Sequence, residues 1–309
     1  MRELGQQAWR ARLWASCAAV FLVLSVTSQA QESGRPVISP DNLVRLTVQN
    51  EMAASDHTSI KHLFRSRKQT TKETQTHLYV ETSQAMAGML VAVDGHPLTA
   101  QQQQNELNRL YGLAGNPDAL RKKRAREAQD EEHSLRILRA MPDAFRYEYA
   151  GVETGTQTVG GEGAQLVRLK FTPNASYAAP SRVEQVLEGM TGSLLIDVAQ
   201  HRIACIDGTL FKEVSFGWGI IGRLDQGGHF HVEQANVGDG SWEITEMNLN
   251  VTGKLLLFKR LNLASKEVFG DFQRVPGNMT FAQGVDLLKT EKEKLAQSGG
   301  ADPPGKFPQ

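Results

Sequence analysis

Hydrophobic and polar residues alternate along most of the chain after residue 57. The segment 57–83, HTSIKHLFRSRKQTTKETQTHLYVETS, has two such runs around a polar turn, with Ile60 and Phe64 in the first and Leu78 and Val80 in the second. Because side chains two residues apart lie on one face of a strand, this pattern predicts two strands. Similar runs predict further strands at Met89–Val93, Phe145–Val152, Gln165–Phe171, Ser193–Asp197, Arg202–Ile206, Thr209–Phe216, His229–Gln234, Trp242–Val251, Lys254–Leu263 and Lys266–Val275.

The turns between these strands are short and rich in glycine, as at Gly160-Gly161, Gly227-Gly228 and Thr252-Gly253. Such turns join antiparallel neighbours, because parallel strands need crossovers of about a dozen residues or more. The sequence after Ser193 therefore predicts an antiparallel meander.

Four segments carry helix-start signals. Ser39 and Pro40 supply an N-cap hydroxyl and a proline at the first helical position, and Asn116 and Pro117 repeat the arrangement with an amide. The sequences TAQQ at 99–102 and TFAQ at 280–283 match the capping box. The predicted helices cover about 40–53, 100–112, 116–138 and 281–297. We expect an α+β fold in which these helices pack on one face of one large antiparallel sheet.

The first thirty residues are typical of a secretory signal peptide. Three arginines precede the apolar run 14–26, and Ser28-Gln29-Ala30 then matches a cleavage site, so cleavage is predicted after Ala30 and the mature chain is expected to be periplasmic. The alternative is a lipid anchor on Cys17. No later segment is apolar enough to be a transmembrane helix. Residues 31–297 are expected to form a single domain, with a charged helical insertion at about 99–141, and the tail 298–309 is expected to be disordered.

The charge balance points to no highly charged partner. The chain has 34 basic and 34 acidic residues, and removal of the leader leaves 31 and 33. No nucleic acid is therefore expected as a partner. The basic residues 121–126 are followed closely by acids and predict a solvated helix face.

Gly217, Gly219 and Gly222 have the spacing G-x-G-x-x-G of a dinucleotide-binding loop. That motif requires a helix directly after the glycines, where the pyrophosphate would bind, and no helix pattern follows Gly222. We interpret the glycines as positions where strands bend.

The remaining candidates for chemistry also favour structural roles. His229, His231 and Glu233 lie on one face of a predicted strand, as metal ligands could, but the pattern equally suits a polar outer face. Cys205 lies in the apolar run IACI, which is typical of a buried, inert thiol. Without a catalytic motif the prediction is a protein that is not an enzyme, with no metal and no cofactor.

The segment GSLLIDVAQHRIACIDGTL at 192–210 resembles the LolA/LolB-like lipoprotein-carrier superfamily, and the segments 207–234 and 240–259 resemble a bacterial envelope branch of it. The resemblance spans about 40–275. It implies a curved antiparallel sheet of about 10–11 strands, forming an unclosed half-barrel whose concave face is covered by helices. It also implies an apolar cavity for the acyl chains of lipoproteins or other amphiphiles.

Strand alternation predicts which side chains would line such a cavity. They are Val214, Phe216, Phe230, Val232, Leu249, Val251, Leu257 and Leu261. These side chains could equally contact the helices alone. The expected function is that of a periplasmic carrier or binding protein for an amphiphile, with a lipid or a lipoprotein acyl chain as partner. The alternative is a non-enzymatic cell-envelope protein that binds another protein.

Overall fold

The computed structural model describes residues 38–57, 60–216, 222–238, 240–255 and 259–297. The predicted signal peptide with Cys17, the predicted disordered tail, Gly217, Gly219 and Leu257 lie outside the described residues.

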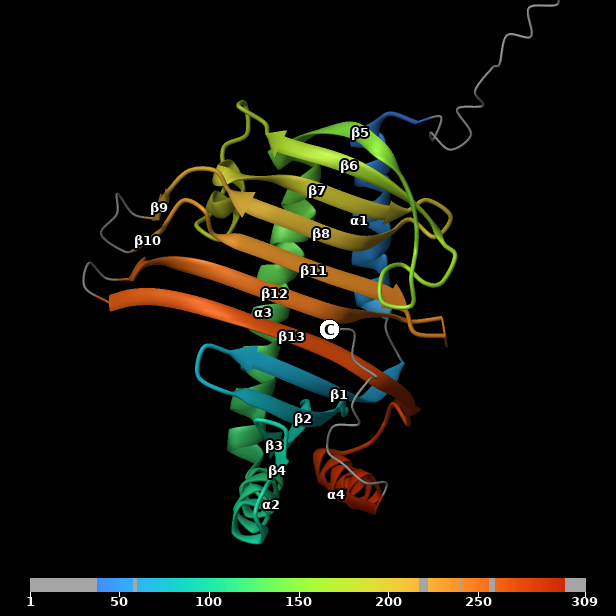
Figure 1. Cartoon of the computed structure of the whole chain (residues 1–309), viewed down its shortest axis with the longest axis vertical. Helices are drawn as coiled ribbons and strands as arrows, with labels where there is room; N and C mark the ends of the chain where they lie inside the picture. Colours follow the sequence, from blue (N-terminus) through green and yellow to red (C-terminus); the bar gives the residue numbers. More distant parts are fainter. Residues whose placement is uncertain (1–37, 58–59, 217–221, 239, 256–258, 298–309) are drawn as a thin grey trace, which may run out of the picture. The chain divides into compact units, whose positions relative to one another are not determined.

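The described residues form one open antiparallel sheet of 13 strands, as predicted for the fold class (Figure 1). Its order is β4-β3-β2-β1-β13-β12-β11-β8-β7-β6-β5, and β10 pairs with β9 and β12 beside this path. The strands are β1 Lys61–Thr70, β2 Thr74–Val80, β3 Ala87–Val93, β4 His96–Pro97, β5 Phe145–Thr154, β6 Gln165–Pro173, β7 Met190–Asp197, β8 Arg202–Leu210, β9 Val214–Phe216, β10 Gly222–Leu224, β11 His229–Asn236, β12 Trp242–Leu255 and β13 Lys259–Val275.

The helices begin where the capping signals predict. They are α1 Pro40–His57, α2 Ala100–Ala114, α3 Pro117–Ala144 and α4 Phe281–Gln297, with a short 3₁₀ helix η1 at Glu184–Gly189. At α2 the capping box is complete, because Thr99 accepts from the Gln102 amide and Gln102 accepts from the Thr99 amide. At α3 the side-chain oxygen of Asn116 accepts from the Ala119 amide, which caps the helix without a reciprocal bond.

The strand boundaries near two glycines differ from the prediction. The predicted turn at Thr252-Gly253 is wrong, because β12 continues through it to Leu255. A Cβ atom on Gly253 would lie 2.2 Å from the backbone oxygen of Arg223. Gly253 therefore allows β10 to approach β12 and does not mark a turn.

Gly222 is the first residue of β10 and pairs with Phe216. A strand follows it, and not the helix that a phosphate-binding loop needs.

Two cores hold the helices to the sheet. We call the sheet face that carries Ile206, Phe230 and Leu249 the inner face and the opposite face the outer face. One core joins α1 and α3 to the inner face of β5–β8 through residues such as Leu43 and Leu169.

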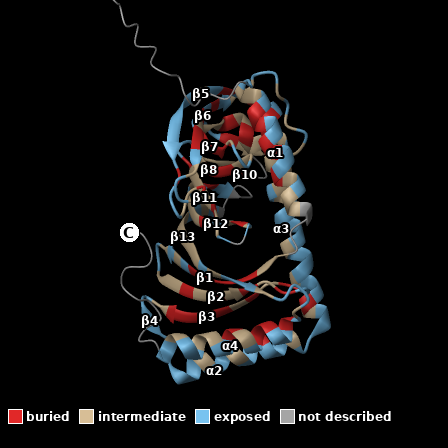
Figure 2. Cartoon of the chain, turned by 90° about the vertical axis from the view of Figure 1, so that its right-hand side faces the viewer, coloured by how far each residue is buried: buried red, intermediate tan, exposed pale blue. Residues whose placement is uncertain are grey.

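The second core joins α4 and parts of α2 and α3 to β1–β3. There α4 packs on Val80 and Ala87, which alternate with the inner-face residue Tyr79. The last helix thus covers the outer face of this part of the sheet, whereas α1 and α3 cover the inner face (Figure 2). The prediction of helices on one face holds for α1 and α3, and α4 differs from it.

Candidate functional site

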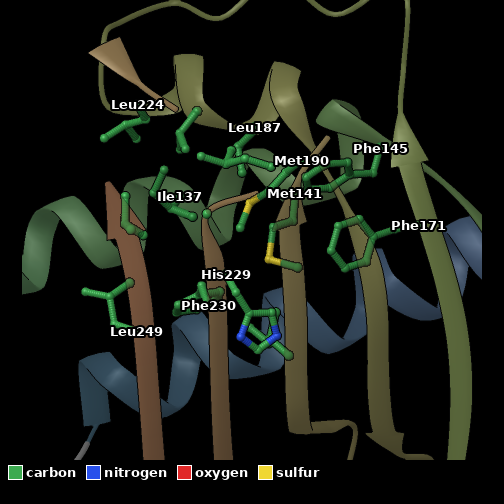
Figure 3. A pocket seen from close by; sticks show the side chains of 15 residues that line it. Ile137, Met141, Phe145, Phe171, Leu187, Met190, Leu224, His229, Phe230 and Leu249 are labelled. Atoms are coloured by element: carbon green, nitrogen blue, oxygen red, sulfur yellow. The ribbon is translucent and has the colours of Figure 1, made fainter. Parts of the chain in front are cut away.

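Two apolar cavities lie between the inner face of the sheet and α3. The first has a volume of about 290 Å³ and is bordered almost entirely by hydrophobic side chains from α3, η1 and the strands β5 to β12 (Figure 3). The second has a volume of about 390 Å³. Ile137 and Met141 of α3 border both cavities, as do Ile206 of β8 and Phe230 of β11. We refer to the two together as the apolar cavities.

Strand alternation explains why the sequence makes an apolar wall here. Phe230 and Val232 of β11 pair with Leu249 and Met247 of β12 and point to the inner face. On α3, Ile137 and Met141 are four residues apart and therefore lie on one side of the helix. A cavity between two such surfaces can hold an apolar ligand without opposing polar groups.

The structure places the nominated lining residues in different environments. Phe230, Leu249 and Val251 border the first cavity, and Phe230 and Val232 border the second. Val214 is buried against Gly189. Phe216 and Leu261 are half-buried and border neither cavity.

Sequence reasoning missed the side of the cavities opposite the sheet. This side comes from α3 and from η1, which contributes Val186 and Leu187. No capping signal marks the start of η1, because its N-cap residue, Val183, has no side-chain cap hydrogen bond, although Ser181 and Glu184 have capping-box spacing. The hydrophobic spacing of Ile137 and Met141, in contrast, was visible as a helix face.

One member of a largely buried ion pair, Glu51, borders the second cavity. Glu51 of α1 contacts Arg202 at 2.9 Å, and it accepts hydrogen bonds from the Ile203 amide at 2.7 Å and from Gln234 at 3.3 Å. Arg202 in turn lies over the ring of Trp242, 5.2 Å from its centre. These contacts satisfy the carboxylate, so Glu51 anchors α1 to the sheet.

A third cavity, of about 400 Å³, has polar walls and lies beside β2, β3, α2 and α3. We call it the polar cavity. Its walls include His77, Tyr79, Glu106, Arg109 and Lys123. Arg109 donates to both carboxylate oxygens of Glu106, at 2.6 and 2.8 Å, and also to the Gly88 carbonyl at 2.8 Å. Glu106 also accepts a hydrogen bond from the Leu90 amide at 3.0 Å, so it satisfies a backbone donor at the edge of β3.

The polar cavity changes the acidity of its side chains. Burial lowers the pKa of His77 and raises the pKa of Tyr79. Burial also acts to raise the pKa of Glu106, but the hydrogen bonds from Arg109 and the Leu90 amide outweigh it and lower this pKa. The cavity therefore holds a neutral imidazole beside an ionised Glu106–Arg109 pair at neutral pH.

The predicted H-x-H-x-E face is part of a hydrogen-bonded cluster on the outer face. Asp207 of β8 contacts His231 at 2.9 Å and His229 at 3.2 Å, and Glu233 contacts the other nitrogen of His231 at 3.2 Å. The sulfur of Cys205 lies 3.9 Å from His231. Among the described residues, no group of three or more His, Cys, Asp and Glu side chains is arranged to hold a metal ion. The cluster is thus a set of ion pairs that binds β8 to β11.

We expect this cluster to make stability depend on pH at alkaline values. The neighbouring Cys205 sulfur, Glu233 and Asp207 raise the pKa of His231 to about 11, although burial opposes them. A histidine whose pKa is raised by folding stabilises the fold fully below its unfolded pKa, about 6.5, and this contribution is lost as the pH rises through the folded pKa. The unfolding free energy of the wild type minus that of His231→Gln should therefore shrink between about pH 6 and about pH 10.

Denaturant titrations of both proteins across this range measure the difference, and the ring proton signals of His231 report its charge directly. Ring signals that titrate near pH 6.5 would contradict the prediction.

No protein-family model, curated protein or solved structure matches the chain. Within the described ranges, none of the helices combines the length and the apolar character needed to span a membrane.

Proposed function

We propose that the protein is a periplasmic carrier or binding protein that holds the acyl chains of lipoproteins or of another amphiphile between its curved sheet and α3. The observation that carries the proposal is the pair of apolar cavities, which share Ile137, Met141, Ile206 and Phe230. Concave, mostly apolar volumes of about this size are typical of sites for small apolar ligands. The resemblance to the LolA/LolB-like superfamily and the leader sequence support the same proposal.

The described side chains also favour binding over catalysis. Among the described residues that border the apolar cavities there is no nucleophile paired with a base, and the carboxylate of Glu51 is engaged in an ion pair with Arg202. Binding of a fluorescent fatty acid, together with extraction of the natively purified protein for a bound amphiphile, tests the proposal. Absence of both would contradict it.

The second candidate is a cell-envelope protein that binds a protein partner. The observation that favours it is β5, the last strand in the sheet order, which carries the exposed side chain of Val152 at 44% exposure. An edge strand can pair with a strand of another chain. Crosslinking in cells that recovers one stoichiometric partner through β5, with no bound amphiphile, would favour this candidate.

A further inference from the structure

Along one row of paired residues, the inner face of the sheet changes from apolar on β12 to charged on β13 and β1. On β12, Leu249 and Met247 are apolar and border the apolar cavities. The register places Glu267 of β13 beside Met247 and Lys68 of β1 beside Glu267. The same face then continues to His77 on β2, which borders the polar cavity.

The cavity-lining side chains of α3 change from apolar to polar in the same direction. Ile137 and Met141 near its C-terminal end border the apolar cavities, whereas Lys123, nearer its N-terminal end, borders the polar cavity. Ser134, which borders the second apolar cavity, is eleven residues after Lys123. At the rise of an α-helix this separation is roughly 16 Å, within the length of a long-chain amphiphile. Sheet and helix thus each run from an apolar end to a polar end.

The charges at the polar end are balanced. Four charged side chains interact electrostatically with His77. They are the carboxylates of Glu106 and Glu267 and the cations of Arg109 and Lys68. They form two ion pairs, because Glu106 contacts Arg109 at 2.6 Å and Glu267 contacts Lys68 at 3.0 Å. Lys123 is likewise paired with Glu127 at 2.9 Å. An anionic group would meet cations that are already neutralised, whereas a group with both charges can interact with both members of a pair.

We infer that the polar cavity receives a zwitterionic headgroup, such as a phosphate ester of a cationic amino alcohol, while the acyl chain of the same molecule occupies the apolar cavities. This inference rests on the proposed function and specifies its ligand class. Burial of the acyl chain in the apolar cavities supplies affinity for any such amphiphile. The ion pairs around His77 discriminate between headgroups.

A displacement experiment with the full chain tests the inference. Three competitors that have the same acyl chain length each displace a bound fluorescent fatty acid. The competitors are a lysophosphatidylcholine, a lysophosphatidylglycerol and a monoacylglycerol, all below their micelle concentrations. We expect the zwitterionic competitor to act at a concentration about fivefold lower than the anionic one. The uncharged competitor should fall between them.

Two variants and a control assign the preference to the polar cavity. Glu106→Gln leaves Arg109 without its carboxylate partner and should improve the anionic competitor by about threefold, whereas Lys68→Met leaves Glu267 unpaired and should weaken it by a similar factor. Glu153→Gln makes the same charge change beside Arg168, far along the sheet on β5 and β6, and should leave the preference unchanged. Binding of the anionic fatty acid should change in the same direction as that of the anionic competitor in Glu106→Gln and Lys68→Met and stay unchanged in Glu153→Gln, so the competitors are compared by the ratio of their inhibition constants within each variant.

Equal competition by all three lipids, or equal changes in Glu106→Gln and Glu153→Gln, would overturn the headgroup inference while leaving the proposed function in place. Failure of the wild type to bind the fluorescent fatty acid would overturn both.

Discussion

Replacing Phe230 by glutamate is expected to weaken binding of a fluorescent fatty acid by at least about tenfold, which corresponds to about 1.4 kcal/mol. Phe230 borders both apolar cavities, so an apolar ligand in either one would have to displace water from the new carboxylate. Desolvation of an unpaired charge is costly in an apolar environment. Equilibrium titration of the probe by fluorescence measures the loss.

Two further variants separate this effect from unfolding. Phe230→Leu keeps the wall apolar and should bind the probe within about threefold of the wild type. Val152→Glu introduces the same charge on the exposed edge strand β5 and should bind like the wild type. A Phe230→Glu protein that melts cooperatively and still binds with wild-type affinity would place the ligand elsewhere.

Replacing Phe281 by alanine is expected to lower the free energy of unfolding by about 3–5 kcal/mol. The ring lies at the first residue of α4, is fully buried and belongs to the core that joins α4 to β1–β3. Its removal leaves a cavity that the helix start cannot easily fill, because Thr280 and Gln283 fix the cap by hydrogen bonds. Urea denaturation followed by circular dichroism measures the change.

The matched control is Phe211→Ala, which removes the same side chain at 43% exposure and should change stability by no more than about 0.5 kcal/mol. Equal losses in the two variants would mean that α4 is not docked through Phe281.

Local signals predicted the features that depend on neighbouring residues. The capping patterns at Thr99 and Asn116 located two helix starts, because the bonds that make a cap connect residues only three apart. Alternation placed Phe230 and Leu249 on one face, because the side chains of a strand have a period of two.

Features that depend on long-range pairing could not be predicted in this way. Asp207-Gly208 looks like a turn, yet β8 runs through it because Gly208 pairs with Gly192 on one side and with Phe230 on the other. The pairing of β1 with β13 joins residues about two hundred positions apart. The Lys68–Glu267 ion pair beside His77 depends on that register, so the charge balance around His77 could not be predicted from the sequence.

Extraction of protein purified without detergent, followed by mass spectrometry of the extract, tests the central claim most directly. We predict a long-chain amphiphile near one equivalent per chain, and a large loss of it in Phe230→Glu but not in Val152→Glu. An extract without amphiphile from wild-type protein that also fails to take up added fatty acid would contradict the claim that the space between the sheet and α3 is a ligand site.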